Sequence, residues 1–410
     1  MHILYLHQYF VGPDGAGGTR SFEMARRWVR WGHHVTLVTS SARFSAGAPD
    51  EVQRTMVDGI EVVVLPVPYS SEMSFAGRMR AFGAFASAAA RWAVRTPADV
   101  IFASSTPLTI ALPGMLGSKF RRVPMVFEVR DLWPELPIAV GALRSRPAIA
   151  AARMLERAAY HASSQVIALS PGMAEGVLRQ GVERHRVHVI PNACDVEAFD
   201  VDEAEARRYT RALVPSERPL VVYAGSFGAI NDVAWLVDVA TKSEIDFSFV
   251  GDGPGRAAIE ARARASGTWE RSVFVRPPVP KREVPLLLRG AALATSLFLP
   301  IPEMEHNSAN KFFDALAAGT PLAINYGGWQ AKLLEDTGAG IVLPRSDVEA
   351  AAKMLSERVR DDAWRERASS AARQLARTRF DRDMLARQAL SVIEAARTSG
   401  APSTIMAPSS

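Results

Sequence analysis

The chain has 410 residues, of which 48% are hydrophobic and 22% charged, and its formal net charge is +5. This length exceeds what one ordinary hydrophobic core supports and predicts two domains. The modest basic charge suits anionic partners such as phosphates or an acidic membrane surface. The sequence lacks the dense basic tract of a nucleic-acid-binding arm, so no nucleic-acid partner is expected.

The single cysteine, Cys194, excludes a disulfide within the chain and suits a reducing compartment. The N-terminal residues lack the charged start and long apolar core of a signal peptide. No apolar stretch is long enough to predict a transmembrane helix. We therefore expect a cytoplasmic protein, with peripheral contact at the inner face of the cytoplasmic membrane as an open alternative.

The first residues predict the opening of a parallel α/β sheet. Residues 3–6 are typical of a strand, 19–31 of a helix and 35–38 of the next strand, with a glycine-containing loop between the first two. Gly17 and Gly18 would let a phosphate or sugar approach the backbone closely. Their spacing matches neither a dinucleotide fingerprint nor a Walker A loop, so a flexible surface loop is the alternative.

Segment 75–95 interleaves aromatic residues with arginines and contains no acidic residue. A basic, aromatic, amphipathic helix can lie on an anionic membrane surface. The alternative is a helix that packs on the sheet and leaves its arginines in solvent.

The strand predicted at 124–129 ends in a group of charged residues, with Glu128, Arg130 and Asp131 close together. Ligands of open α/β sheets bind outside the carboxyl ends of the strands. This strand end is therefore a candidate polar site, and a structural pair between Arg130 and Asp131 is the alternative.

The second half repeats the alternation of strands and helices, with glycines at the ends of the strands predicted at 220–224 and 247–250. The sequence predicts a first domain over 1–198 and a second over 199–379. A helix over 380–397 is expected to pack back on the first domain, and a Ser-, Pro- and Ala-rich tail over 398–410 is expected to be disordered.

A polar, turn-prone stretch that includes Asn307 and Asn310 runs into a helix that Gly319 ends. A loop that feeds a helix N-terminus offers free backbone N–H groups and the positive end of the helix dipole. Lys311 adds a point charge in the first turn. The pattern suits a phosphate or diphosphate site, and an ordinary capped helix with a solvated Lys311 is the alternative.

Six motifs stand along the chain. They are Gly-Gly-Thr-Arg at 17–20, Glu-Val-Arg-Asp-Leu-Trp-Pro-Glu-Leu-Pro at 128–137, Ile-Pro-Asn-Ala-Cys-Asp at 190–195, Tyr-Ala-Gly-Ser-Phe-Gly at 223–228, Val-Gly-Asp-Gly-Pro at 250–254 and Asn-Lys-Phe-Phe-Asp-Ala-Leu-Ala-Ala-Gly-Thr-Pro at 310–321. These motifs resemble those of GT-B glycosyltransferases of the retaining family 4, and the resemblance covers about residues 1–395. Within that family the chain is similar to O-antigen and capsule enzymes that transfer amino sugars, including N-acetyl-fucosamine transferases.

The resemblance implies two facing Rossmann-like domains with a central cleft, a nucleoside-diphosphate sugar as donor and no metal or other cofactor. Lys311 would stabilise the leaving diphosphate, and Asp314 would take the place of the glutamate that grips the ribose hydroxyls. The catalytic residues implied are Arg130, Asp131 and Lys311. The donor-binding residues implied are Gly17, Gly18, Gly225, Ser226, Asp252, Glu305, Asn307, Ser308, Asn310, Lys311 and Asp314.

The chain departs from the family pattern at three places. His306 stands where the first of two glutamates is usual, with Glu303 and Glu305 nearby. Polar residues, Ser226 and, roughly, Asn231, stand where the family often has basic ones. Arg130 stands where a histidine often lies, and a guanidinium donates hydrogen bonds but cannot act as a base.

The sequence thus predicts a retaining glycosyltransferase that moves an amino sugar from a nucleoside-diphosphate donor, with UDP expected, to a lipid-linked saccharide acceptor. Two alternatives stay open. One is a UDP-sugar 2-epimerase of the same fold, and the other is a non-catalytic protein that binds nucleotide sugars.

Overall fold

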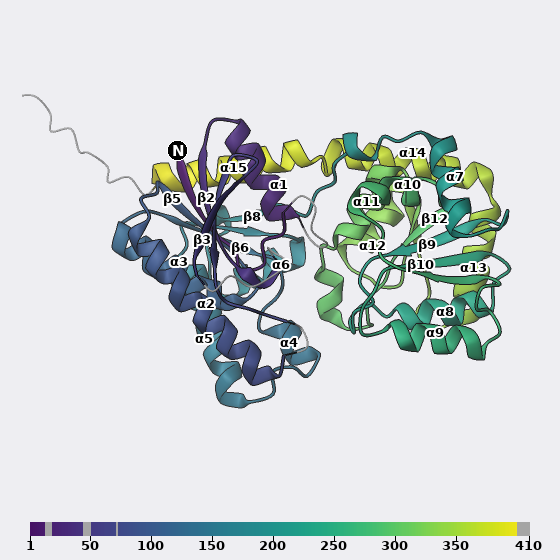
Figure 1. The fold of residues 1–410 in the computed structure, drawn as a ribbon, viewed down its shortest axis with the longest axis horizontal. Helices are drawn as coiled ribbons and strands as arrows, with labels where there is room; N and C mark the ends of the chain where they lie inside the picture. Colours follow the sequence, from purple (N-terminus) through teal and green to yellow (C-terminus); the bar gives the residue numbers. More distant parts are fainter. Residues whose placement is uncertain (13–18, 44–50, 71–72, 400–410) are drawn as a thin grey trace, which may run out of the picture. The chain divides into compact units, whose positions relative to one another are not determined.

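The computed structural model describes residues 1–12, 19–43, 51–70 and 73–399 (Figure 1). The chain divides into two compact units, as its length requires. The first unit contains Met1–Ile190 and the chain from Leu385 onward, and the second contains Pro191–Met384. Each unit has its own sheet and its own hydrophobic core.

The first unit is built on an eight-stranded sheet in the order β3-β4-β2-β1-β5-β6-β7-β8. Every pairing is parallel except that of β3 with β4. The strand order reverses between β1 and β5, which is where open α/β sheets bind ligands. The strands are β1 (His2–Leu6), β2 (His34–Ser40), β3 (Gln53–Val57), β4 (Ile60–Leu65), β5 (Val100–Ser104), β6 (Met125–Val129), β7 (Gln165–Ala168) and β8 (Val187–Val189).

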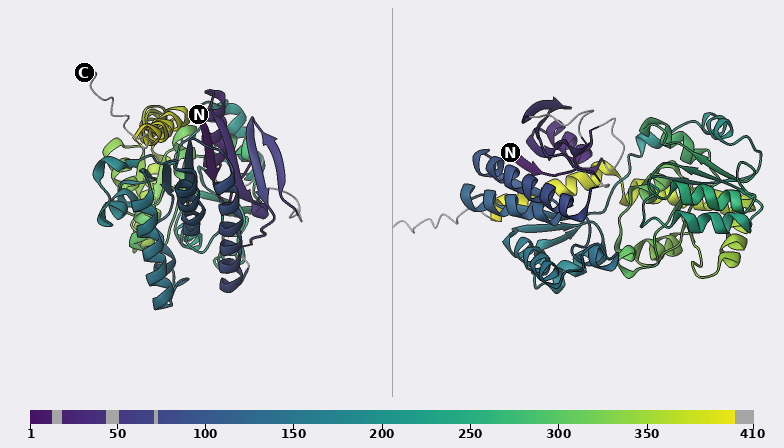
Figure 2. Two further views of the ribbon diagram at one scale, coloured as in Figure 1. Left: turned by 90° about the vertical axis from the view of Figure 1, so that its left-hand side faces the viewer. Right: turned by 60° about the horizontal axis from the view of Figure 1, so that its bottom comes forward.

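Helices cover the first sheet and supply its core. Phe85 of α2, Tyr160 of α5 and Met173 of α6 are buried in the same cluster as strand residues such as Leu4 and Phe127. Helices α2 and α3 lie side by side (Figure 2). The helices are α1 (Arg20–Arg30), α2 (Phe75–Arg95), α3 (Ala111–Arg121), α4 (Glu135–Ala139), α5 (Arg146–Ala162), α6 (Pro171–Arg179) and the greater part of α15 (Arg382–Ser399).

The second unit is built on a six-stranded parallel sheet in the order β11-β10-β9-β12-β13-β14. This is the Rossmann order, and it reverses between β9 and β12. The loops that follow β9 and β12 therefore flank the position where a nucleotide is expected. The strands are β9 (Leu220–Ala224), β10 (Asp246–Val250), β11 (Val273–Arg276), β12 (Leu293–Ser296), β13 (Leu322–Ile324) and β14 (Gly340–Val342).

The core of the second unit packs α8, α9, α13 and α14 against aromatic and branched strand residues such as Phe247 and Phe249. Helix α11 contacts α10 and α14. The helices are α7 (Glu203–Leu213), α8 (Val233–Thr241), α9 (Arg256–Ala265), α10 (Val284–Arg289), α11 (Asn310–Ala318), α12 (Trp329–Thr337), α13 (Val348–Arg360) and α14 (Asp362–Arg379), with short 3-10 turns η4 (Glu197–Phe199) and η6 (Pro302–His306).

The division between the units lies at 190/191, whereas the sequence places it at 198/199. The segment that follows Ile190 joins the second unit because it hydrogen-bonds there. The Asn192 N–H donates to the Ser308 hydroxyl at 3.0 Å, and the Cys194 N–H donates to the Phe380 carbonyl at 2.9 Å. The indole N–H of buried Trp28 donates to the Ala386 carbonyl at 3.0 Å, which ties the end of the chain to the first unit.

The alternation of strands and helices predicted from the sequence is confirmed in both halves. Strand β3 escapes sequence analysis because it is an exposed edge strand without an apolar alternation. Helix α7 lies in the charged stretch interpreted as a domain boundary. Thr398 and Ser399, assigned to a disordered tail, belong to α15, and 400–410 lie outside the described residues.

Two strand-end loops of the second unit approach each other so closely that only glycine fits at their contact. Gly251, after β10, has φ +156°, and a Cβ there would lie 1.9 Å from the Gly225 carbonyl oxygen. The Phe227 N–H donates to the Asp252 carbonyl at 2.8 Å, and the Gly255 N–H donates to the Phe227 carbonyl at 2.8 Å. The loops after β9 and β10 therefore form one rigid wall.

We predict that Gly251→Ala lowers the free energy of unfolding by about 3 kcal/mol, because the new methyl group forces the loops apart and the backbone is strained. Chemical denaturation followed by circular dichroism measures this loss. Gly267→Ala is the matched control, since Gly267 has φ +68° and no atom within 4 Å of the added Cβ. Equal losses in the two variants would show that the contact with Gly225 contributes nothing.

Candidate functional site

The Lys311 side chain lies against the strand-end loop that follows β9. Its ammonium donates a hydrogen bond to the Tyr223 hydroxyl at 2.7 Å, and that hydroxyl donates to the Ser226 carbonyl at 2.7 Å. The Nζ atom also lies 4.5 Å from the centre of the Tyr223 ring and 5.7 Å from that of Phe298. Lys311 is thus a fixed cation at the carboxyl end of the central strands, not a solvated one.

Burial of the Lys311 ammonium lowers its pKa to about 7. A cation removed from water favours losing its proton, and the neighbouring aromatic rings compensate only in part. A bound anion would raise this pKa again. The charge on Lys311 is therefore poised to respond to a ligand near neutral pH.

The loop that precedes α11 is held by hydrogen bonds from several elements. The Asn307 side chain accepts from the Ala309 N–H at 3.2 Å, and the Trp329 indole N–H donates to the Asn307 carbonyl at 2.8 Å. Ser308 accepts from the Asn192 N–H through its hydroxyl. Within the described residues, no side chain caps the N-terminus of α11, which begins at Asn310. The Phe312 N–H donates to the Ala309 carbonyl at 3.1 Å, which leaves the N–H groups of Asn310 and Lys311 for an anion.

Asp314 occupies a different environment from Lys311, although the two are three residues apart on α11. Burial raises the pKa of its carboxyl group to about 6, while the positive charges of Arg382 and Lys281 act to lower the pKa and Asp195 acts to raise it. Lys311 instead contacts Tyr223. The two side chains thus occupy separate charge environments in the second unit.

The remaining candidates of the second unit lie on the loops around this position. Gly225 passes close to Lys311, since a Cβ there would lie 3.6 Å from Nζ. Ser226 and Asp252 are exposed, and Asp252 accepts from the Gly253 N–H at 2.8 Å. Glu305 is exposed at the end of η6, where a Cβ on Gly327 would lie 3.2 Å from its Oε1 atom.

The first unit gathers a second polar cluster at the switch point of its own sheet. Buried His7, directly after β1, contacts the Ser21 hydroxyl at 2.8 Å through Nδ1 and Arg130 Nη1 at 3.0 Å through Nε2. A guanidinium only donates, so Nε2 accepts and the imidazole is the neutral tautomer with its proton on Nδ1. His7 thereby orients Arg130.

Asp131 and Glu128 have different roles in this cluster. The Thr106 hydroxyl donates to Asp131 Oδ2 at 2.7 Å, which orients a carboxylate that is only partly buried. Glu128 is 1% exposed and pairs with Arg20 at 2.9 Å. Glu128 also accepts from the Ser104 hydroxyl at 2.5 Å. Glu128 is therefore a buried structural residue, whereas Asp131 is oriented at the strand end.

Sequence reasoning missed several residues that position the candidates. Tyr223, Phe298, His7 and Thr106 each contact one of them, and Ser21 contacts His7. Tyr223 and His7 lie at the ends of central strands, a placement that could have identified them. The predicted residues Gly17 and Gly18 lie outside the described residues.

Both halves of the chain match known families of sugar-transferring domains. Residues 15–193 match the family described as glycosyl transferase 4-like domain, and residues 218–361 match glycosyl transferases group 1. Together these matches cover most of the chain, including Arg130, Asp131 and Lys311. The chain belongs to the GT-B glycosyltransferases.

Relatives and solved structures agree with this assignment. The glycosyltransferase is 28% identical over 232 residues to 2-deoxystreptamine N-acetyl-D-glucosaminyltransferase of Streptomyces fradiae, over 53% of this chain and 52% of that one. The matched region thus spans about half of that relative. Sucrose-phosphate synthase from Thermosynechococcus elongatus has the same fold, with a TM-score of 0.78, 18% identity and coverage of 97% of this chain and 99% of that one.

Anabaena HepE in complex with UDP-glucose also shares the fold of the glycosyltransferase, with a TM-score of 0.71 and 18% identity, over 96% of this chain and all of that chain. The predicted two-domain α/β architecture of the GT-B type is therefore confirmed. The first matched domain contains Arg130 and Asp131, and the second contains Lys311 and Tyr223.

We predict that Lys311→Met stabilises the glycosyltransferase at pH 6 while it weakens UDP binding at least tenfold. In the folded chain the Lys311 pKa is about 7, whereas in the unfolded chain it is about 10.4. The unfolded chain therefore binds more protons between these values, and the stability of the wild type rises relative to the variant as pH increases through this range. The melting temperature of the variant should exceed that of the wild type at pH 6, and the gap should narrow toward pH 10.

Differential scanning fluorimetry measures the melting temperatures, and calorimetric titration measures UDP binding. Lys332→Met is the control, because Lys332 is 75% exposed and pairs with Asp336 one turn away. That control should show no such dependence on pH. An unchanged UDP affinity in Lys311→Met would remove Lys311 from the donor site.

Proposed function

We propose that this enzyme is a retaining glycosyltransferase that moves an amino sugar from a UDP-linked donor to a lipid-linked saccharide in the synthesis of a cell-surface polysaccharide. The observation that carries the proposal is the fixed ammonium of Lys311 beside the uncapped N-terminus of α11. Both groups suit a diphosphate. The UDP complex of HepE supports the nucleotide, and the N-acetyl-D-glucosaminyl donor named for the Streptomyces fradiae relative supports an amino sugar.

In this proposal Lys311 and the N–H groups of α11 stabilise the negative charge that develops on the departing diphosphate. The reaction needs no metal, because these protein groups supply the positive charge. Asp314 contacts the ribose of the donor. The donor site in the second unit also includes Gly225, Ser226, Asp252, Glu305, Asn307, Ser308 and Asn310.

Arg130 and Asp131 act on the sugar and the acceptor. Arg130 stays protonated and donates hydrogen bonds, so it cannot take the proton of the attacking hydroxyl. Its contact with His7 leaves other guanidinium N–H groups available for the donor sugar. Asp131, oriented by Thr106, is the carboxylate placed to orient the acceptor.

We predict that Asp131→Asn lowers kcat at least a hundredfold and changes the KM for the donor less than threefold, because the carboxylate acts on the acceptor side of the reaction. The assay combines UDP-N-acetylglucosamine with a polyprenyl-diphosphate-linked saccharide and follows product by mass spectrometry. EDTA should leave the wild-type rate unchanged. Proton NMR of the product should show the same anomeric configuration as the donor.

Three outcomes of the assay would contradict the proposal. Formation of an isomeric UDP-sugar without acceptor would favour the epimerase alternative. Donor binding without transfer to any acceptor would favour a binding protein. The third outcome is transfer to 2-deoxystreptamine, the acceptor named for the Streptomyces fradiae relative, without transfer to the lipid-linked saccharide. It would show that the proposed lipid-linked acceptor is wrong.

A lipid-linked acceptor requires contact with a membrane, and α3 offers the best surface for it. Helix α2 does not present the aromatic face expected of segment 75–95, because Phe82 and Phe85 are buried. Its neighbour α3 exposes a stripe of Leu112, Leu116 and Phe120, of which Phe120 is 67% exposed. Within the described residues, no helix combines the length and apolarity that crossing a bilayer requires.

Basic residues surround this stripe. Lys119, Arg121 and Arg122 lie at the C-terminal end of α3 and are exposed. Arg80 and Arg91 are exposed on the adjacent α2. An apolar stripe flanked by cations suits insertion into an anionic membrane surface, where each cation contributes about 1 kcal/mol. This supports peripheral binding at the inner face of the cytoplasmic membrane.

We predict that the double substitution Leu116→Asp and Phe120→Asp reduces binding to phosphatidylglycerol vesicles at least tenfold, because it removes apolar contact and adds negative charge. Vesicle flotation measures the bound fraction. Met56→Asp is the control, since Met56 is 63% exposed but lies on the edge strand β3. Equal flotation of the wild type and the double variant would exclude this surface.

A further inference from the structure

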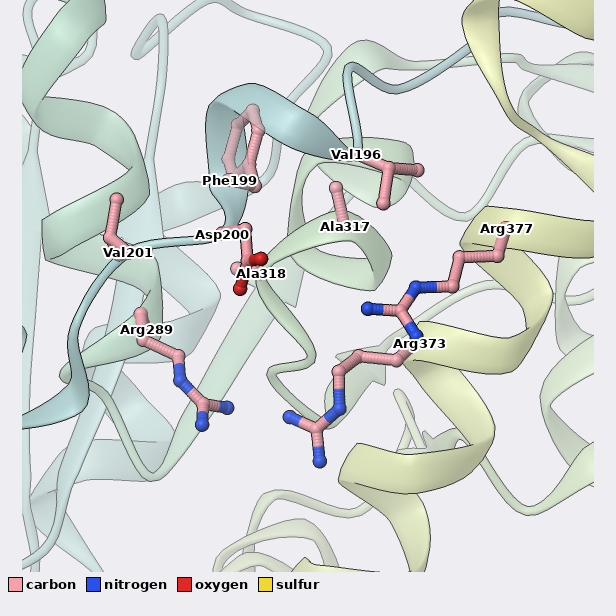
Figure 3. Close-up of a pocket in the computed structure, with 9 residues that line it drawn as sticks. All are labelled: Val196, Phe199, Asp200, Val201, Arg289, Ala317, Ala318, Arg373 and Arg377. Carbon is pink, nitrogen blue, oxygen red and sulfur yellow. The ribbon is translucent and has the colours of Figure 1, made fainter.

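A second concave site lies in the second unit, at the end of α11 opposite Lys311. The residues Ala317 and Ala318 of α11 form part of its wall. They lie about 10 Å along the helix from Lys311, at the usual rise of about 1.5 Å per residue. The cavity has a volume of about 240 Å³, and Figure 3 shows the side chains that line it. Helices α10, α11 and α14 and the segment around η4 supply these residues.

The cavity is lined by an unusual concentration of arginine. Arg289 ends α10, and Arg373 and Arg377 lie one turn apart on α14. In Figure 3 their guanidinium groups extend from the two helices into the space between them. Guanidinium groups present planar sets of N–H donors that match the oxygens of phosphate.

The positive charge of this cluster is only partly neutralised. Arg289 pairs with Glu203 at 2.8 Å. Within the described residues, neither Arg373 nor Arg377 has a hydrogen bond or ion pair to a carboxylate, although Asp200 also lines the cavity. Burial and the charges of Arg289 and Arg377 lower the pKa of Arg373. The like charges repel one another, and a bound anion would relieve that repulsion.

Backbone beside the cavity fixes Arg373, and the cavity leaves room for a small ligand. Gly319, directly after α11, has φ +65°, and a Cβ there would lie 2.5 Å from Arg373 Nη1. The guanidinium therefore packs on bare backbone, where any side chain would displace it. The volume of about 240 Å³ lies near the lower end of small-ligand sites, which begin at about 300 Å³. A phosphate with a small organic group matches this size.

We propose that this cavity binds the phosphate group of a small phosphorylated metabolite through Arg373 and Arg377, with Arg289 completing the site. None of its lining residues belongs to the donor site proposed above. Binding here is therefore independent of the diphosphate site at Lys311. The group that the cavity recognises is a phosphate dianion, which either inorganic phosphate or a sugar phosphate can supply.

The test titrates the full chain with inorganic phosphate and with glucose 6-phosphate by calorimetry, at an ionic strength held constant with sodium chloride. The variants are the double substitution Arg373→Gln and Arg377→Gln, and the single substitution Arg377→Gln, which changes an exposed side chain. Arg367→Gln is the control, because Arg367 is exposed on α14 and does not line the cavity. Lys311→Met separates this site from the donor site.

We expect saturable binding to the wild type, to Arg367→Gln and to Lys311→Met, and at least tenfold weaker binding to both cavity variants, as the loss of a charge-assisted hydrogen bond implies. Tighter binding of glucose 6-phosphate than of phosphate would identify a sugar phosphate as the ligand, and the reverse would identify the free ion. Absence of saturable binding to the wild type would overturn the proposal. Binding lost in Lys311→Met but kept in the cavity variants would also overturn it.

Discussion

The contact between the Lys311 ammonium and Tyr223 is the interaction on which the proposed donor site depends. It joins α11 to the end of β9 and, through the Tyr223 hydroxyl, to the carbonyl of Ser226. The cation is held where water is scarce, so it loses affinity for its proton. The site therefore attracts an anion strongly, and Lys311 gains or loses its proton at a low energetic cost near neutral pH. That combination suits a leaving group whose charge changes during the reaction.

Local patterns were sufficient to predict the sheets and helix α11. Strand periodicity, glycine at strand ends and the run from Asn307 into α11 are properties of neighbouring residues. The same patterns could not reveal the contact of Arg130 with His7, because these residues are 123 positions apart in the chain and meet only when the sheet forms. The sequence also did not reveal which face of α2 is buried. A basic helix with aromatic residues has the same sequence signature whether Phe82 and Phe85 face a membrane or, as here, a core.

Arginine and lysine carry different tasks in the second unit. The proposed donor site uses one lysine, Lys311, whose ammonium is compact and whose pKa responds to its surroundings. The opposite end of α11 is flanked by arginines, which keep their charge and offer several donors in a plane. A single short helix thus separates two anion-attracting environments of different chemistry.

The last helix has a consequence for how this protein is made. Trp28 belongs to the first strand–helix repeat of the chain, yet the carbonyl that its indole N–H contacts is Ala386 in α15. Ala386, Ala389 and Ile393 are likewise buried, so α15 contributes to a core whose other members are synthesised first. During translation the apolar face of the first unit that α15 covers stays exposed until α15 leaves the ribosome. The second unit, which is continuous in sequence, can complete its sheet before then.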